Sequence, residues 1–475
     1  MADRPDDPTG DFSADRASLT RRDLLKAAAL AGAALGTSGG FSPAIAETIT
    51  AGTASDAVPA GLAARATMKG VPFARHETVR IGIVGTGLRG RSLLSELLAI
   101  EGVRITAVCD TVAEKTARAV KMCTDAGRPA PAVIVAGDKG FGQLAARDDV
   151  DFVYTATPWE WHVPVLLSAL KNGKHCGSEC PVGTTLKDLW ALVDASEKAR
   201  RHCLQLENCN YGETEMLVNR LVHAGIFGEV LHAEAAYLHD LRKILFETRD
   251  EGLWRRAWHT RSNSNLYPTH GLGPVSWYLD VHAGDRFDFI VSASSPQRGL
   301  ELHREATVPD KSDPKWAERY VAGDFNTSIL KTVRGKTVML QHNVSNPRPY
   351  TRHNRVQGTK GAFEDYPPRI YVEGQAGGER WTTIDSWKAT HTDPLWQKFG
   401  AEARRVGGHG GMDYIMAYRL VQTMREGLVP DFDVYDAAAW SAPLPLSEIS
   451  VAKGSAPVKF PDFTRGAFAS ARAAG

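Results

Sequence analysis

The 475-residue chain contains only six cysteines and no Cys-x-x-Cys pair. Six are too few for a disulfide scaffold in a chain of this length, and the ligand spacing of a common zinc site is missing. We therefore expect no metal centre. Most of the cysteines, which fall between Cys109 and Cys209, are expected to be small buried hydrophobic residues.

The sequence also has little net charge, no internal repeats and, beyond its N-terminus, no apolar run that approaches the length of a membrane span. Its 56 basic and 55 acidic residues leave a net charge of +1. No global field would draw such a chain to nucleic acid or to an anionic membrane, so a small neutral ligand fits better. A 43% hydrophobic content and this length allow two sizeable domains.

The N-terminus, residues 1–46, resembles a twin-arginine export signal. Arg21-Arg22 precede a weakly apolar run at 27–36, and Ala44-Ile45-Ala46 offers a small-x-small cleavage site. The run is too short and too rich in Gly and Ala to cross a bilayer. We expect a periplasmic or exported mature protein that begins near Glu47, with no membrane association once the signal is removed, and a linker over residues 47–78.

The stretch from Val79 to Asp110 organises the rest of the chain. An apolar run at 79–84 predicts a strand buried on both faces of a parallel sheet. Gly85, Gly87 and Gly90 follow on the G-x-G-x-x-G spacing and open a helix. The first two glycines let the backbone turn and approach a pyrophosphate, and the third allows close helix packing.

A second strand, 104–109, ends at Asp110, twenty residues after Gly90. A carboxylate there accepts hydrogen bonds from ribose hydroxyls and would repel a 2′-phosphate. A lone glycine fingerprint is weak evidence, but here strand, helix, second strand and acid are in register. We predict NAD as the cofactor.

The same α/β pattern continues to about residue 207. Helices are expected at 113–126, 162–172 and 185–201, and strands at 132–135, 151–157, 174–178 and 203–207. Such alternation is typical of a doubly wound parallel sheet of the Rossmann type, here over residues 79–207. The residues 158–162, with sequence PWEWH, would form a loop at the carboxyl end of a strand and face the cofactor. Alternatively, the two tryptophans fill a domain interface.

The pattern changes over residues 208–450. A helix at 213–223 is followed by strand-like runs at 230–238, 287–294, 325–333 and 337–344, with a late helix at 411–426. Consecutive runs with short turns predict an α+β domain with a mostly antiparallel open sheet. Residues 451–475 form a tail with no strong signal.

Tyr267-Pro268-Thr269-His270 is the best catalytic candidate. Pro268 suits the first position of a helix, which places His270 in the first turn, where the helix dipole favours a neutral ring able to accept a proton. Taken alone, the pair is more often a hydrogen-bonded structural histidine beside a core tyrosine.

A Rossmann domain followed by an antiparallel domain resembles the Gfo/Idh/MocA oxidoreductase group. From Arg80 to Glu448, strings such as ENCNYGETEM, NLYPTHGLGPVSWY, NPRPYTRHN and GGHGGMDY resemble glycoside hydrolase family 109, which includes NAD-dependent α-N-acetylgalactosaminidases. The wider group usually carries Glu-Lys-Pro where this chain has Glu179-Cys180-Pro181. A thiol cannot replace an ammonium donor at a sugar hydroxyl, so the substitution favours the glycosidase branch.

The resemblance implies three sets of site residues. NAD would contact Leu88, Arg89, Asp110, Trp159, Glu160, Trp161, His162, Glu179, Cys180 and Asn208. Substrate would contact Tyr237, Arg255, Tyr267, Pro268, Thr269, His270 and Tyr350. Tyr211 would join Tyr267 and His270 as a catalytic residue. Without the resemblance, Tyr237 is a core strand residue and Arg255 a surface charge.

The resemblance further implies hydrolysis of terminal N-acetylhexosaminides by transient oxidation at carbon 3, elimination and addition of water, an exception to the usual two-carboxylate mechanism. It also implies a homo-oligomer, because antiparallel sheets in this fold group often pair across subunits. Two alternatives remain open: a net NAD-dependent sugar or cyclitol dehydrogenase, and an exported sugar-binding protein without turnover.

Overall fold

The computed structural model describes residues 67–375 and 378–470. The expected export signal, residues 1–46, lies outside the described residues, as do residues 47–66 of the expected linker. The remaining part of that linker is packed against the fold. Met68 and Phe73 are buried, and the backbone N–H of Phe73 donates to the carbonyl of Leu428.

In the described chain, six parallel strands form the first sheet, in the order β3-β2-β1-β4-β5-β6. The strands follow the apolar runs of the sequence, because both faces of this sheet are covered by helices and the side chains on both faces are buried. The strands are β1 (Val79–Val84), β2 (Val103–Cys109), β3 (Ala132–Ile134), β4 (Phe152–Thr155), β5 (His175–Ser178) and β6 (Cys203–Gln205). The helices are α3 (Leu88–Leu98), α4 (Ala113–Asp125), α5 (Phe141–Ala145), α6 (Trp159–Lys171) and α7 (Leu186–Ala199).

The second sheet has nine strands within the described residues, in the order β14-β13-β12-β11-β7-β10-β9-β8-β15. All its neighbouring pairs are antiparallel except β7 and β10, which are parallel. The strands are β7 (Val230–Leu238), β8 (Phe287–Ser294), β9 (Asn326–Thr332), β10 (Thr337–Asn343), β11 (Arg355–Gly358), β12 (Gly361–Glu364), β13 (Arg369–Val372), β14 (Thr382–Thr383) and β15 (Val458–Lys459).

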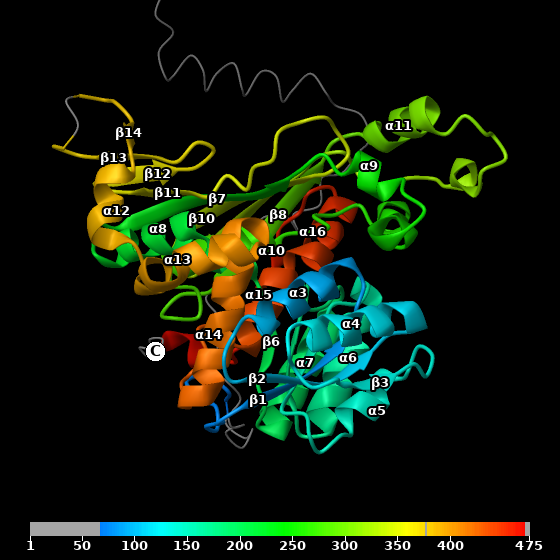
Figure 1. Cartoon of the computed structure of the whole chain (residues 1–475). Helices are drawn as coiled ribbons and strands as arrows, with labels where there is room; N and C mark the ends of the chain where they lie inside the picture. The colour runs from blue at the N-terminus through cyan, green and yellow to red at the C-terminus, as the bar shows by residue number, and fades with distance from the viewer. Residues whose placement is uncertain (1–66, 376–377, 471–475) are drawn as a thin grey trace, which may run out of the picture. The chain divides into compact units, whose positions relative to one another are not determined.

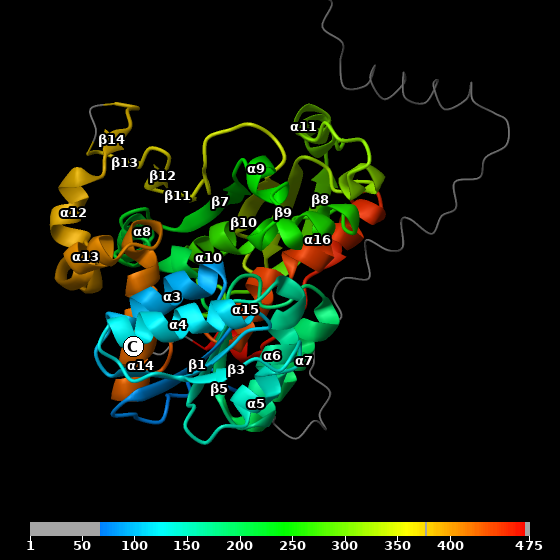
Figure 2. The same ribbon diagram turned by 45° about the vertical axis from the view of Figure 1, so that its right-hand side comes forward.

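Helices of the C-terminal half connect the two sheets. Helix α10 packs on β7, α15 packs on both β6 and α7, and α10 contacts α15. Helix α16 packs on β8, and α14 packs beside α3 (Figures 1 and 2). The helices are α8 (Glu213–His223), α9 (Arg242–Leu245), α10 (Thr269–Tyr278), α11 (Gly299–Thr307), α12 (Asp385–His391), α13 (Pro394–Val406), α14 (Met412–Glu426), α15 (Val434–Ser441) and α16 (Pro443–Ala452).

Two expectations about secondary structure were wrong. The WEWH residues do not form a loop, because α6 begins at Trp159, directly after Pro158. The start was missed because Pro158 makes no side-chain cap, and a polar N-cap is the usual signal. The tail also has structure: β15 pairs with β8, and Phe460 and Phe463 are buried.

All six cysteines lie within the described chain, where they are buried and make no disulfide. This agrees with the expectation that most are small buried hydrophobic residues. In residues 67–375 and 378–470, no helix has both the length and the apolar character needed to cross a bilayer.

Candidate active site

The glycine loop between β1 and α3 has the shape of a phosphate cradle. Gly85 has φ +83°, and a Cβ there would lie 2.9 Å from the carbonyl oxygen of Ala156, so only glycine fits. A Cβ on Gly90 would overlap the carbonyl oxygen of Gly85. A Cβ on Gly87 would meet only the ammonium group of Lys115, 3.7 Å away. The first and third glycines are therefore required by packing, and the second leaves space for a ligand.

Asp110 follows β2 and lies beside this loop. Its carboxylate accepts hydrogen bonds from the backbone N–H of Thr86 at 2.8 Å and from that of Val112 at 3.0 Å. The Thr86 hydroxyl also donates to it, at 3.3 Å. These bonds hold the acid at the carboxyl end of the sheet, where a ribose would lie.

Three of the expected cofactor residues meet in one buried polar network. Arg89 Nε lies 3.0 Å from Glu179, and its Nη1 lies 2.5 Å from Asp413 on α14. Asn208 donates to the other oxygen of Asp413 at 2.5 Å, and the hydroxyl of Tyr154 donates to Glu179 at 3.1 Å. The network joins the glycine-loop helix, the end of β5 and the start of α14.

Aromatic rings gather on the other side of the site. The rings of Tyr237 and Tyr267 lie 4.7 Å apart, and Trp159 stacks on Tyr267 at 5.7 Å. The guanidinium of Arg255 lies 4.9 Å from the centre of the Tyr267 ring and is held by Glu251 at 2.5 Å. The same guanidinium lies 5.3 Å from the centre of the Trp159 ring and 5.9 Å from that of the Tyr237 ring, so all three rings contact the cation. This arrangement suits stacking and hydrogen bonding to a sugar.

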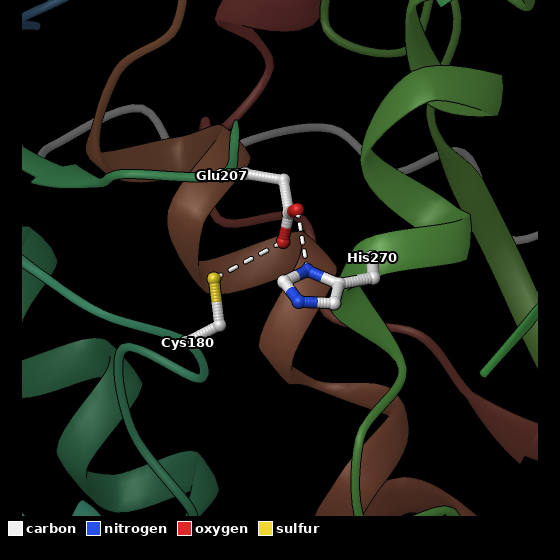
Figure 3. Close-up of side chains that lie close together, drawn as sticks. All are labelled: Cys180, Glu207 and His270. Carbon is white, nitrogen blue, oxygen red and sulfur yellow. Dashed lines mark hydrogen bonds and ion pairs between the residues drawn. The ribbon is translucent and has the colours of Figure 1, made fainter. Parts of the chain in front are cut away.

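His270 lies between this aromatic cluster and a buried carboxylate. Its Nε2 is 3.4 Å from the hydroxyl of Tyr267, and its Nδ1 is 2.6 Å from Oε1 of Glu207. Oε2 of Glu207 accepts from the thiol of Cys180 at 3.1 Å (Figure 3). Burial alone would raise the pKa of Glu207, but the charge and hydrogen bond of His270 outweigh it and lower the pKa to about 2.

Two family models cover most of the chain. Residues 79–206 match the oxidoreductase family with the NAD-binding Rossmann fold, and residues 211–470 match the C-terminal domain of glycosyl hydrolase 109. A glycosyl hydrolase family 109 protein of Saccharopolyspora erythraea is 54% identical over 94% of this chain and 95% of its own. Another, from Solibacter usitatus, is 51% identical over 94% of this chain and 97% of its own.

The chain belongs to glycosyl hydrolase family 109. This confirms the predicted family. It also confirms the predictions that the protein is an NAD-dependent glycoside hydrolase and that its cofactor is NAD.

Solved structures confirm the predicted fold class of this family 109 chain. A levoglucosan dehydrogenase in complex with NADH and L-sorbose matches with a TM-score of 0.61 at 16% identity, covering 82% of this chain and all of its own. An oxidoreductase domain protein from Kribbella flavida matches with a TM-score of 0.63 at 17% identity, over 81% of this chain and 100% of its own. At these identities the likeness concerns the fold alone.

The four WEWH residues of the family 109 chain separate into different environments. Trp159 enters the aromatic cluster, whereas Trp161 packs against Phe141 at 6.2 Å and Glu160 is exposed. His162 is fully buried, and its ring nitrogens lie 2.7 and 2.8 Å from the backbone carbonyls of Pro181 and Thr157. Its ring thus ties α6 to the segment after β5.

Tyr211 is not brought to the Tyr267–His270 pair. Its hydroxyl donates to Asp431 at 2.9 Å, and its ring contacts Trp277 and Phe432. Tyr350, in contrast, reaches the aromatic cluster at 6.1 Å from Tyr237 and is 37% exposed. Leu88 is 56% exposed at the glycine loop, which agrees with a position at a ligand surface.

The helix that carries His270 starts one residue later than expected. Pro268 is the N-cap rather than the first helical residue, and Thr269, fully buried, opens α10. His270 therefore remains in the first turn, as predicted. The carboxylate of Glu207, 2.6 Å from Nδ1, acts on the ring in the opposite sense to the helix dipole.

Several residues of the site were not predicted from the sequence. Glu207 and Asp413 are buried carboxylates whose partners are distant in the sequence. Trp254 and Trp258 contact Trp159 at 5.3 and 5.6 Å. The one available signal was the GGHGGMDY string, which includes Asp413 but does not reveal its partner.

Within the described residues, Cys180, Glu207 and His270 form a group whose ligand atoms lie within 4.8 Å of one another, which is compact enough to consider a metal ion. The hydrogen bonds given above account for the same proximity.

Proposed function

We propose that this protein hydrolyses terminal N-acetylhexosaminides, with α-N-acetylgalactosaminides as its substrates, through transient oxidation at carbon 3 of the sugar. The observation that carries the proposal is the contact of His270 with Tyr267 beside a cluster of aromatic rings and a buried arginine, at the carboxyl end of a dinucleotide-binding sheet. This arrangement supplies a base and a sugar platform next to a cofactor.

The cradle at Gly87, the acid Asp110 and the network around Arg89 fit a dinucleotide. When bound, NAD supplies a reversible oxidation at carbon 3, so that the ketone acidifies the hydrogen on carbon 2 and the group at carbon 1 can be eliminated and replaced by water. The chain's own residues bind the sugar, orient it and move its protons.

His270 and Tyr267 are the residues that exchange protons with the sugar. A general base has to lie within hydrogen-bond reach of the proton that it removes, and the Nε2 and hydroxyl of this pair face each other at 3.4 Å. Tyr237 and Trp159 offer ring faces on which a sugar stacks. Arg255 offers N–H donors that suit the carbonyl of an N-acetyl group.

The decisive experiment follows an aryl α-N-acetylgalactosaminide with the purified holoprotein. The phenol should be released in many turnovers without accumulation of NADH, and in deuterated water deuterium should enter at carbon 2. Release without exchange would contradict the elimination step. Stoichiometric NADH and a keto product would instead identify a net sugar dehydrogenase.

A matched pair of histidine variants separates turnover from binding. His270→Ala should abolish phenol release while the protein keeps its NAD. His232→Ala changes a histidine of β7 that bonds to Thr337, at the opposite end of this strand from Tyr237, and should leave turnover unchanged.

We also propose that the protein is exported to the periplasm through the twin-arginine pathway, on the Arg21-Arg22 pair and the apolar run that follows it. When the full-length gene product is expressed, the mature protein should appear in the periplasmic fraction with NAD bound, and a variant with both Arg21→Lys and Arg22→Lys should remain in the cytoplasm. Equal export of both would contradict the proposal.

A further inference from the structure

Glu207 is a completely buried carboxylate that sits between two side chains of the site (Figure 3). It follows β6 and caps a short 3-10 helix at 208–211. Its Oε1 accepts from the backbone N–H of Cys209 at 3.2 Å and faces Nδ1 of His270 at 2.6 Å. Its Oε2 accepts from the thiol of Cys180 at 3.1 Å. Both oxygens are therefore occupied from inside the protein.

We propose that Glu207 is a positioning residue that fixes the tautomer of His270, so that Nε2 is the atom that takes up the substrate proton. The inference rests on the proposed function, because it names the proton acceptor of that reaction. It assigns no contact between Glu207 and the sugar.

The tautomer follows from the donor and acceptor capacity of each group. An ionised carboxylate only accepts hydrogen bonds, and a neutral imidazole has one donor and one acceptor nitrogen. At 2.6 Å from Glu207, Nδ1 must carry the hydrogen. Nε2 then presents its lone pair to the opposite side, toward the Tyr267 hydroxyl at 3.4 Å.

The ionised state of Glu207 is well supported by its surroundings. The Cys180 thiol and the Cys209 N–H both donate to its oxygens, and Nδ1 of His270 lies 2.6 Å from Oε1, and hydrogen bonds of this kind favour the charged carboxylate. The thiol stays protonated, because burial and then the negative charge of Glu207 raise the pKa of Cys180 well above its usual value. Cys180 is thus a donor and not a competing anion.

During turnover, the carboxylate of Glu207 stabilises the protonated ring of His270. When the carbon 2–hydrogen bond of the keto sugar breaks, its electron pair stays on the sugar as an enolate, and the proton forms the Nε2–H bond of His270. The ring becomes an imidazolium in the first turn of α10, where the helix dipole is unfavourable. The negative charge of Glu207, 2.6 Å from the ring, balances it.

A metal ion held by Cys180, Glu207 and His270 is the rival explanation of this group. Two ligands at about 2 Å from a tetrahedral ion lie roughly 3.3 Å apart, since the angle between them is near 109°. The 2.6 Å between Nδ1 and Oε1 is shorter than this and is the length of a charge-assisted hydrogen bond. The contacts therefore favour a hydrogen-bonded chain.

The first test measures the tautomer itself in the wild-type holoprotein. Nitrogen NMR of histidine-labelled protein, assigned with His270→Ala, should show a protonated Nδ1 and an unprotonated Nε2. The opposite tautomer would overturn the proposal. This measurement requires no turnover, so the proposal about Glu207 can stand even if no glycoside is cleaved and the proposed function fails.

The second test is Glu207→Gln, whose amide can donate to Nδ1 and impose the wrong tautomer. We expect kcat to fall by on the order of 10²- to 10⁴-fold, with the bound NAD and KM nearly unchanged.

Two further variants and a measurement of bound metal serve as controls for Glu207→Gln. Glu207→Asp keeps the charge and should recover part of kcat. Glu215→Gln removes another buried carboxylate, paired with Arg352, and should leave the His270 tautomer unchanged. An unaltered rate in Glu207→Gln would overturn the proposal. So would a stoichiometric metal ion whose removal by a chelator abolishes turnover.

Discussion

Arg89, in the first turn of α3, forms an ion pair of 2.5 Å with Asp413, in the first turn of α14, although 324 residues separate them in the chain. The side chain of Asp413 is completely buried, and its other oxygen accepts from Asn208. The helix that starts at the glycine loop is thereby fastened to the C-terminal half. The same carboxylate therefore links the glycine-loop helix to the packing of the C-terminal half.

Asp413→Asn should therefore weaken both stability and NAD binding. Burial by itself would raise the pKa of Asp413, but Arg89 and His409 outweigh it and lower the pKa below its usual value, so the group is charged at neutral pH. Removing one partner of a buried pair costs about 3–5 kcal/mol, and because Arg89 keeps Glu179 we expect about 2–3 kcal/mol. Denaturant unfolding at pH 7 measures the loss of stability, and the same experiment with NAD present measures how much the cofactor stabilises each protein.

The control for this variant is Asp385→Asn, which removes an exposed partner of Lys388 on α12. It should change the free energy of unfolding by less than about 0.5 kcal/mol. Equal effects of the two substitutions would contradict the importance of the buried pair.

Glu96 should make the protein less stable as the pH rises. Burial, and then the negative charge of Asp413, raise the pKa of Glu96 to about 8, against 4.5 in the unfolded chain. Between these two values the unfolded state has lost its proton and the folded state keeps it, so stability falls with increasing pH. Glu96→Gln removes this dependence. We expect it to be more stable than wild type by about 1–3 kcal/mol at pH 8 and equally stable below pH 4.5.

Unfolding free energies measured from pH 4 to pH 9 test the prediction. Parallel pH curves for the two proteins would show that Glu96 does not keep its proton in the fold. Glu101→Gln, in an exposed position shortly after α3, provides the baseline.

The sequence predicted most of the strands that build the two sheets, because long apolar runs set these elements. The bounds of β7 and β8 agree with the predicted runs at 230–238 and 287–294. Strands β11 to β14 were missed, since each has four residues or fewer and is defined by pairing rather than by composition. The N-terminus of α6 was missed for lack of a polar cap.

The site was predictable only where a local motif or the family resemblance indicated its residues. Tyr267 and His270 share one turn of chain, so the YPTH string was enough to pair them. The apolar pattern predicts only that Glu207 ends a strand. No residue next to it in the sequence indicates its hydrogen bond to His270, 63 residues later. Long-range contacts of single charged residues leave no periodic signal in a sequence.

Tyr211→Phe should leave catalysis almost intact, because the Tyr211 hydroxyl bonds to Asp431 and is not brought to His270. We expect kcat within about threefold of wild type and a loss of about 1 kcal/mol of stability from the hydrogen bond. Tyr267→Phe is the matched change in the site and should lower kcat by at least about tenfold. A larger loss of kcat in Tyr211→Phe than in Tyr267→Phe would return Tyr211 to the catalytic residues that the resemblance implied.

Gly87→Ala should lose NAD binding and Gly90→Ala should lose stability, although both glycines lie in the same loop. Gly87 has a negative φ, −70°, in extended backbone, and its Cβ would meet only Lys115 at 3.7 Å. This variant should fold with nearly wild-type stability and lose NAD, since the methyl group takes the space of the phosphates. In Gly90→Ala the methyl group would overlap the Gly85 carbonyl, so we expect a loss of about 3 kcal/mol or more, from overpacking.

Thermal unfolding and the NAD content of the purified proteins separate the two outcomes. If Gly87→Ala kept NAD at full affinity, the phosphates could not pass over this position, and the cradle assigned to the loop would be wrong. If both variants lost stability equally, the second glycine would be required by packing like the third. The space left at Gly87 is an argument for a ligand only because the fold itself makes no use of it.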